Sequence, residues 1–150
     1  MRLWHKDLIP VLPRQQLISQ WRECCCIAKN IADNGTPNHL LVNKVLNYYP
    51  REFYAYTQSI KNEMKDRGYK VSEDAWGRFN KNFFEGRRHF DIPYGANIDF
   101  LPFDIFSDWH TKRYFLQCFY NLQEKFDCYG MSHDEWRKIR DLKIEKYGKE

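Results

Sequence analysis

Hydrophobic residues recur at steps of three and four along much of the chain, which is the spacing of one face of an α-helix. The clearest run lies between Pro13, which can occupy the first position of a helix, and Gly35, which can follow its last turn. The apolar positions within this run are Leu17, Trp21, Cys24, Ala28 and Ile31. We therefore predict a first helix over residues 13–35 with one buried face.

The same spacing, punctuated by Pro, Gly and Asn, continues after this first helix. The predicted helices cover residues 39–46, residues 50–68, a segment that begins at Ser72 or Asp74, residues 108–130, and a last segment that begins at Ser132. Ser132 and Glu135 have the spacing of a capping box, which favours a helix start. Residues 91–104 are predicted to form an ordered loop. Because strand-like alternation is scarce, the sequence predicts an all-α fold, a compact single domain of about five to six helices over residues 1–150.

Composition narrows the class of protein. The 150 residues are 43% hydrophobic and 17% aromatic, which is enough for one domain with a real core. No apolar stretch approaches the roughly 20 residues of a membrane span, and the first residues lack the apolar region of a secretory signal. Five cysteines, three of them contiguous at 24–26, indicate reduced thiols rather than disulfides. We expect a cytoplasmic monomer without a membrane partner.

Positive charge is concentrated with aromatic rings in two segments, although the net charge is only +4. The first segment, residues 76–90, carries Arg78, Lys81, Arg87 and Arg88 against one acid. Cations can neutralise phosphates, and rings can fill gaps left by unstacked bases. The alternative is that the rings belong to the core and the charges to a solvated rim, which is the commoner arrangement for aromatics at helical spacing.

The second basic segment is the C-terminus, residues 136–150. Its cations outnumber its acids and are Arg137, Lys138, Arg140, Lys143, Lys146 and Lys149. Cations near the end of a helix also complement the helix macrodipole. Phosphate binding and a solvated surface are equally compatible with this pattern.

Side chains suited to other chemistry are scattered. The chain has no C-x-x-C and no H-E-x-x-H spacing, and consecutive helical cysteines point about 100° apart, so we expect no metal site. Glu23 stands in a polar stripe beside the apolar face of the first helix. The other members of this stripe are Gln16, Ser19, Cys26 and Asn30. By pattern alone, a structural or solvent-facing Glu23 is favoured over a catalytic one.

The N-terminal stretch "MRLWHKDLIPVLPRQQLISQWRE" resembles the start of the pyrimidine-dimer DNA glycosylases, the bacteriophage endonuclease V family. The matching features are a basic residue next to the amino terminus, a short lead-in, and a helix that carries an aromatic followed by Arg-Glu. These features fall on Arg2, Gln15, Leu17, Trp21, Arg22 and Glu23. The closing "KYGK", residues 146–149, is similar to the aromatic-basic tail of that family.

The resemblance implies a compact, mainly α-helical DNA repair enzyme that needs no metal or organic cofactor and acts on damaged double-stranded DNA. It implies that the α-amine of the first residue attacks C1′ of the damaged nucleotide, releases the base and forms an imine, after which β-elimination cuts the strand. On this basis the predicted catalytic residues are Met1, Glu23 and Arg22. The predicted DNA-binding residues are Arg2, Gln15, Arg22, Arg87, Arg88, Arg137, Lys138, Arg140, Lys146 and Lys149.

Each catalytic role also follows from the resemblance. Glu23 matches the carboxylate that stabilises the cationic sugar and moves protons, and Arg22 matches a residue that grips phosphate near the lesion. An α-amine has a reference pKa of about 7.7–8.0, so a useful fraction is neutral near pH 7. The localisation implied is cytoplasmic and DNA-associated.

The sequence also departs from the family pattern. Initiator removal needs a small second residue, and here that residue is Arg2, so the nucleophile is expected to be the amine of a retained Met1. Gln16 replaces a histidine, and Cys26 replaces an arginine, among the positions expected to contact DNA. The sequence therefore does not predict which DNA lesion the protein recognises. Two other functions also remain open, namely a non-catalytic nucleic-acid-binding module and a small helical protein-interaction domain.

Overall fold

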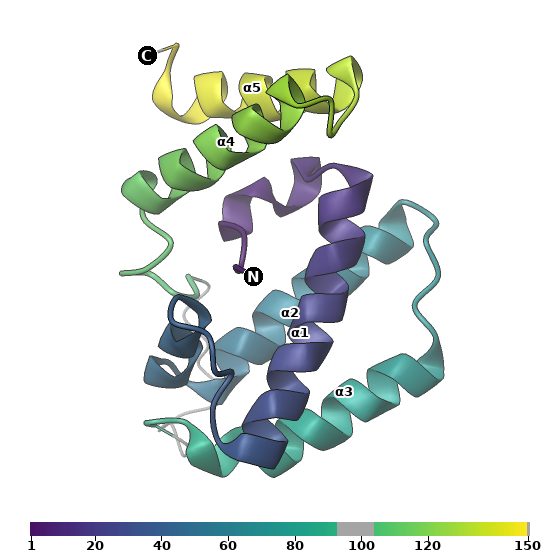
Figure 1. Ribbon diagram of the computed structural model, residues 1–150, viewed down its shortest axis with the longest axis vertical. Helices are drawn as coiled ribbons and strands as arrows, with labels where there is room; N and C mark the ends of the chain where they lie inside the picture. Colours follow the sequence, from purple (N-terminus) through teal and green to yellow (C-terminus); the bar gives the residue numbers. More distant parts are fainter. Residues whose placement is uncertain (93–103, 150) are drawn as a thin grey trace.

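The computed structural model describes residues 1–92 and 104–149, and within these residues every regular element is helical. Five α-helices carry most of the chain, and three short 3-10 helices join or precede them (Figure 1). The α-helices are α1 (Arg14–Asn34), α2 (Pro50–Asp66), α3 (Glu73–Gly86), α4 (Lys112–Asp127) and α5 (His133–Tyr147). The predicted all-α class and the helix number are confirmed.

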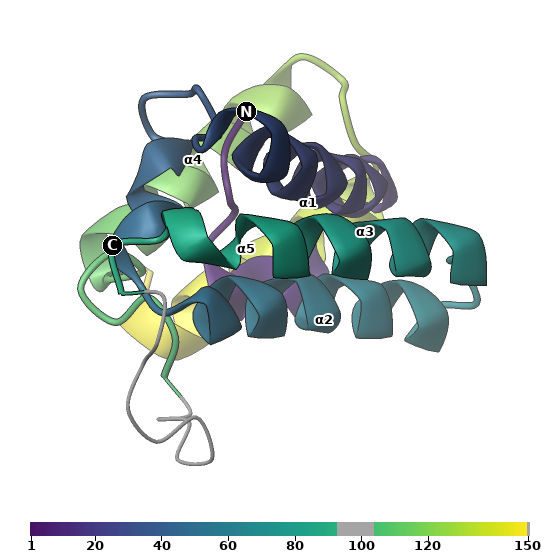
Figure 2. The ribbon, with the colours of Figure 1, turned by 90° about the horizontal axis from the view of Figure 1, so that it is seen from below.

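Helices α1, α2 and α3 form the larger of two layers. Seen from below, they lie in front of the rest of the molecule (Figure 2). The left-handed backbone of Gly35, with φ of 79°, ends α1, and its N–H donates to the Ile31 carbonyl at 2.8 Å. Helix α3 ends against the same turn, where a Cβ on Gly86 would lie 2.9 Å from the Ile31 side chain. Glycine there permits the two helices to approach closely.

Helices α4 and α5 form a hairpin that makes the second layer. The predicted capping box at Ser132 and Glu135 starts α5. The predicted start of the preceding helix at Asp108 is wrong, because Thr111 is its N-cap, with Oγ1 accepting from the Tyr114 N–H. Asp108 therefore lies in the turn before α4. Between the helices, the ring of Trp136 stacks on that of Phe126 at 5.3 Å.

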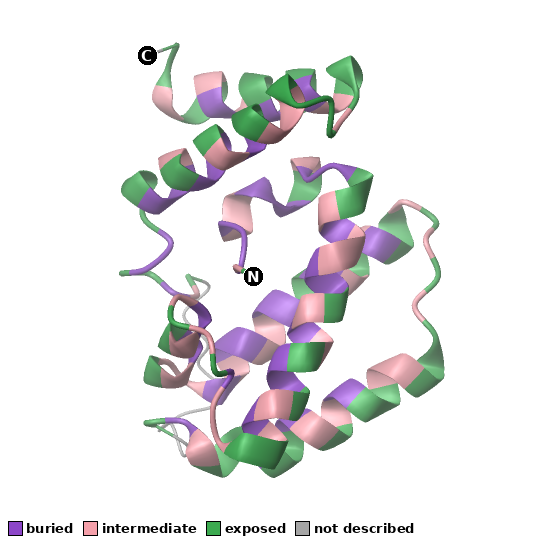
Figure 3. Ribbon diagram, viewed as in Figure 1, coloured by how far each residue is buried: buried purple, intermediate pink, exposed green. Residues whose placement is uncertain are grey.

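A 3-10 helix, η1 (Lys6–Val11), lies between the two layers together with the residues before it (Figure 1). The burial colouring shows this part of the chain as mostly buried (Figure 3). Lys146 of α5 makes an ion pair with Asp7 at 3.0 Å, and the guanidinium of Arg67 donates to the Leu12 carbonyl at 2.7 Å. Contacts from both layers thus fix η1 in place.

The remaining predictions concern the connections. The short helix predicted over 39–46 is the 3-10 helix η2 (Val42–Asn47) rather than an α-helix. A further 3-10 helix, η3 (Arg87–His89), follows α3. The ordered loop predicted over 91–104 lies almost wholly outside the described residues. In the part of the chain that the structure describes, no helix is both long and apolar enough to cross a bilayer.

Candidate active site at the amino terminus

The chain before η1 is held inside the molecule by hydrogen bonds to the first helix. We call residues 1–6 the N-terminal segment. The buried side chain of Gln20 on α1 contacts it twice, because Oε1 accepts from the Trp4 N–H at 2.7 Å and Nε2 donates to the Arg2 carbonyl at 2.9 Å. Leu3, Trp4 and His5 are all buried. Backbone groups removed from water need partners, and Gln20 supplies them here.

Two tyrosines from other helices complete this support. The Tyr56 hydroxyl of α2 donates to the Trp4 carbonyl at 2.6 Å, and the Tyr114 hydroxyl of α4 donates to the Leu3 carbonyl at 2.6 Å. Both rings are buried. The N-terminal segment is therefore bonded to three different helices, which restricts where its first residue can lie.

A buried histidine pair anchors the other end of this segment. His5 Nδ1 accepts from the Asp7 N–H at 3.0 Å, so its Nε2 carries the proton that is donated to the His110 carbonyl at 2.9 Å. His110 Nδ1 in turn accepts from the Lys6 N–H at 2.9 Å. Burial lowers the pKa of His110 to about 2 and also lowers the pKa of His5. Both rings are consequently neutral near pH 7.

This anchoring brings the amine of Met1 near enough to Glu23 for its charge to act on the carboxyl. Partial burial raises the pKa of Glu23, and the charge of the N-terminal amine is the largest influence that opposes the shift. A hydrogen bond from the Arg2 backbone N–H opposes it next. Gln20 Nε2 donates to Glu23 Oε2 at 3.1 Å, so the same amide orients the carboxyl and the N-terminal segment.

A pocket of about 390 Å³ opens at this carboxyl. Its lining residues come from the N-terminal segment, α1, the end of α4 and the turn that follows, and they are Trp4, Gln15, Gln16, Ser19, Glu23, Lys125, Cys128 and Gly130. Three members of the polar stripe predicted on the first helix therefore face this pocket. The lining combines a carboxyl, amide groups, a hydroxyl and one lysine, which suits a polar substrate with anionic groups.

One of the three remaining N-terminal residues that were predicted to act on DNA lines this pocket. Gln15 is exposed and belongs to its lining. Arg22 is exposed on α1, directly before Glu23. Arg2 is half-buried, with its guanidinium 5.3 Å from the centre of the Trp4 ring. Of the five predicted residues of the first helix and N-terminus, Gln15 and Glu23 line the pocket, whereas Met1, Arg2 and Arg22 do not.

The cations predicted to bind DNA from the two basic segments do not line the pocket. Arg87 and Arg88 are exposed on η3, and Arg137 and Lys138 both pair with Asp134 on α5. Lys138 also lines a separate hollow of about 480 Å³. Lys146 is the cation that pairs with Asp7, while Arg140 and Lys149 are exposed.

The rings of the 76–90 segment mostly belong to the core. Phe79, Phe83 and Phe90 are buried, whereas Phe84 is 52% exposed and lies under the guanidinium of Arg87 at 4.8 Å. Burial in this segment therefore follows the alternative interpretation, in which the rings belong to the core and the charges to a solvated rim.

Several residues of the site were not found from the sequence. Gln20 had a usable signal, because it follows Leu17 by three positions and precedes Cys24 by four, so a polar amide falls on the apolar face. Tyr114, Lys125 and Cys128 had none, since they are more than a hundred residues from the segment that they meet.

The thiols and potential metal ligands add no further group to this site. All five cysteines are free. Burial raises the pKa of Cys24, and burial raises the pKa of Cys25 to about 11, so neither is an activated thiolate near pH 7. Within residues 1–92 and 104–149, no three His, Cys, Asp or Glu side chains form a group that could hold a metal ion.

The comparison with protein families finds a match over the same part of the chain. A family model described as pyrimidine dimer DNA glycosylase matches residues 1–76, about half of the chain, and this range includes both Met1 and Glu23. No curated protein and no solved structure gives a significant match.

Proposed function

Because the chain belongs to the pyrimidine dimer DNA glycosylase family, we propose that it excises a damaged pyrimidine from double-stranded DNA and then cuts the strand at the abasic sugar. The nucleophile is the α-amine of Met1 in its neutral form. It attacks C1′ of the damaged nucleotide, the bond from C1′ to the base breaks, and the base leaves with the electron pair.

Strand cleavage follows from the covalent product of that attack. Opening of the sugar ring gives an imine between the amine nitrogen and C1′. The protonated imine withdraws electrons, so a proton can be removed from C2′ while the bond from C3′ to its phosphate oxygen breaks. This is a lyase step, and it needs no metal or organic cofactor.

Glu23 is the residue that we propose moves these protons. Its pKa is raised by burial, which brings the ionised and protonated forms closer to balance near neutral pH, as acid–base catalysis requires. The ionised form also stabilises positive charge that develops on the sugar. The single observation that carries this proposal is that the charge of the Met1 amine acts on the Glu23 carboxyl and lowers its pKa against the effect of burial.

DNA binding is proposed to involve two sets of residues. Arg2, Gln15 and Arg22, of which Gln15 lines the pocket, position the lesion. Arg87, Arg88, Arg137, Lys138, Arg140, Lys146 and Lys149 supply phosphate contacts farther from it. Replacing one phosphate-binding cation, as in Arg88→Ala, should reduce the slope of log K against log salt by about 1. An unchanged slope would exclude that cation from the interface.

We further propose that residues beyond the family match belong to the same functional domain. The wall of the pocket formed by Lys125, Cys128 and Gly130 comes from that part of the chain. The Leu3 carbonyl likewise receives its hydrogen bond from Tyr114. A chain limited to residues 1–76 would lack both.

Borohydride reduction tests the proposed chemistry, because it converts a transient imine into a stable covalent adduct. Native protein incubated with a duplex that contains one abasic site, or one cyclobutane dimer, should give a trapped adduct and a cut strand. Salt-sensitive duplex binding without any adduct would instead support a non-catalytic nucleic-acid-binding module.

Glu23→Gln is the matching variant for the carboxyl. It should slow strand cleavage about 10²–10⁴-fold, the usual range for a positioned acid–base group. Its thermal stability at pH 7 should be equal to or above that of the native protein, because folding raises the pKa of Glu23 and so disfavours the ionised carboxylate. Glu85→Gln, at an exposed acid of α3, is the control. Full cleavage by Glu23→Gln would remove Glu23 from the mechanism.

A further inference from the structure

The turn between α4 and α5 holds a tyrosine in a conformation that tyrosine rarely adopts. Tyr129 has φ of 62° in the left-handed region, and its side chain is 95% exposed. The left-handed region costs a residue with a bulky side chain about 1–2 kcal/mol. Glycine is the usual residue in this region after the last turn of a helix.

Backbone hydrogen bonds fix the turn in this shape. The Tyr129 N–H donates to the Phe126 carbonyl at 2.9 Å, and the Gly130 N–H donates to the Lys125 carbonyl at 2.7 Å. A Cβ on Gly130 would lie 2.9 Å from that same carbonyl oxygen, so a larger residue would not fit there. The tyrosine ring is therefore presented to solvent on a constrained backbone.

The other non-glycine residues with positive φ in the described chain are explained by their surroundings or their type. Phe106, at φ of 53°, is fully buried, and its N–H donates to Glu52 Oε1 at 2.9 Å. Asn38, at φ of 57°, is a residue type that tolerates this region. Tyr129 makes no buried packing contacts that could offset the cost of its positive φ, since almost its whole surface is in water. The hydrogen bonds of the turn need a left-handed residue there but do not need a tyrosine, so the ring itself is a candidate for a role in binding.

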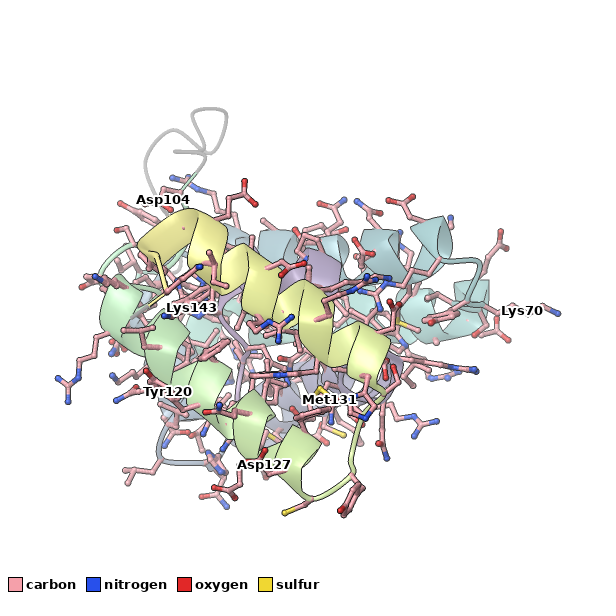
Figure 4. The ribbon with its side chains drawn as sticks, turned by 90° about the horizontal axis from the view of Figure 1, so that it is seen from above. Lys70, Asp104, Tyr120, Asp127, Met131 and Lys143 are labelled. Atoms are coloured by element: carbon pink, nitrogen blue, oxygen red, sulfur yellow. The ribbon has the colours of Figure 1, made fainter. Side chains whose placement is uncertain are left out.

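The position of Tyr129 identifies what it can bind. Its two neighbours, Cys128 and Gly130, line the pocket that also contains Glu23 and Lys125. Figure 4 shows this end of the hairpin between the labelled Asp127 and Met131, away from Tyr120 farther back on α4. An exposed ring between two residues that line a pocket with a carboxyl and a lysine is suited to stack on a nucleobase.

We propose that the ring of Tyr129 stacks on a base that is exposed where the duplex opens at the lesion. This inference rests on the proposed DNA repair function and adds a positioning residue to it. Reaching C1′ requires local opening of the duplex, which costs a few kcal/mol. A ring that replaces the lost stacking offsets part of this cost, and the strained turn keeps the ring extended before DNA arrives.

Duplexes that contain a tetrahydrofuran abasic analogue test the proposal, because this analogue has no aldehyde and can only be bound. Tyr129→Asn removes the ring and retains a residue that accepts positive φ. It should raise the Kd for this duplex roughly 5- to 150-fold, the range that corresponds to about 1–3 kcal/mol for one base–aromatic stack. Its Tm should be unchanged or up to about 4 °C higher. Tyr129→Trp should restore tight binding.

A fluorescent base reports the contact directly. With 2-aminopurine opposite the analogue, native protein and Tyr129→Trp should quench its emission, whereas Tyr129→Asn should not. Tyr120→Ala, which removes a half-exposed ring elsewhere on α4, should behave as the native protein does. Unchanged Kd and unchanged quenching in Tyr129→Asn would overturn the proposal, and so would a Tm that falls along with the affinity. Failure of the enzymatic function is seen separately, as the absence of a borohydride adduct with native protein on abasic DNA.

Discussion

The two halves of the chain contribute to the candidate site in different ways. The half matched by the family model, residues 1–76, carries the amine of Met1 and the carboxyl of Glu23. The other half contributes groups that hold and enclose them, including the Tyr114 hydroxyl on the Leu3 carbonyl and Lys125 in the pocket wall. The groups proposed to react thus lie within the family match, whereas part of their support lies outside it.

The comparison separates the groups that are proposed to react from the groups that hold them in position. An amine at the end of a chain is mobile unless the following residues are tied down. Here those residues are buried and bonded to α1, α2 and α4. Effective chemistry depends on holding the reacting atoms in position. Variants that remove hydrogen bonds to the N-terminal segment from either half should therefore weaken its positioning, by amounts that reflect the bonds removed.

The largest effect is expected from Gln20, which lies in the matched half. Gln20→Leu leaves the Trp4 N–H and the Arg2 carbonyl without their partners. Stability should fall by about 3–5 kcal/mol, and Tm by roughly 6–20 °C. Thermal unfolding followed by circular dichroism measures this change. Gln58→Leu on the exposed face of α2 should shift stability by less than about 0.5 kcal/mol. Equal Tm values for the two variants would show that Gln20 does not hold the segment.

Acid should loosen the contact between the two halves at the histidine pair. The folded-state pKa of His110 is about 2 against an ordinary 6.5, so the unfolded chain binds more protons between these values. The stability contributed by the neutral ring is complete above pH 6.5 and falls by about 1.4 kcal/mol per pH unit below it. The pKa of His5 is lowered as well, which adds to this fall.

Urea unfolding at pH 7.5, 6.5 and 5.5 measures this dependence. His110→Gln keeps an acceptor for the Lys6 N–H and removes the titrating ring. The slope of its unfolding free energy against pH should therefore be smaller than that of native protein, by the amount that corresponds to about one bound proton. A pH dependence identical to that of native protein would mean that His110 is not the group responsible.

A third effect is expected from the half outside the family match. Tyr114→Phe removes one hydroxyl and leaves the Leu3 carbonyl unpaired, which should cost about 1–3 kcal/mol. It should also slow formation of the borohydride adduct, because the N-terminal segment is less well held. Tyr120→Phe on the same helix, at a half-exposed ring, is the matched control for both measurements. Equal adduct rates in the two variants would show that the hairpin does not position the amine.

The helices were largely predictable from the sequence, and the exceptions have physical causes. Capping signals at Gly35 and Ser132 identified the limits of α1 and α5 correctly. The start of α4 was misplaced because Trp109 is buried by packing outside the helix, so its apolar side chain resembled part of a helical face. No hydrophobic periodicity predicts η1 or the buried N-terminal segment, because long-range hydrogen bonds determine their conformation.

The candidate site was predictable only in part. Pattern alone favoured a structural Glu23, and only the resemblance at the amino terminus predicted a catalytic one. The polar stripe nevertheless identified three pocket residues, since Gln16, Ser19 and Glu23 lie on one side of a single helix. Lys125 and Cys128 could not be predicted, because the packing of the α4–α5 hairpin brings them there.

One measurement tests the central claim most directly, namely identification of the nitrogen that carries the sugar after borohydride trapping. Two amines compete for this assignment, the α-amine of Met1, whose charge acts on Glu23, and the Nζ of Lys125 in the pocket wall. Proteolysis of the trapped adduct followed by mass spectrometry should place the sugar on the α-amine of the N-terminal peptide, and Lys125→Met should still form the adduct. A sugar attached to Lys125, with no modification of Met1, would contradict the account.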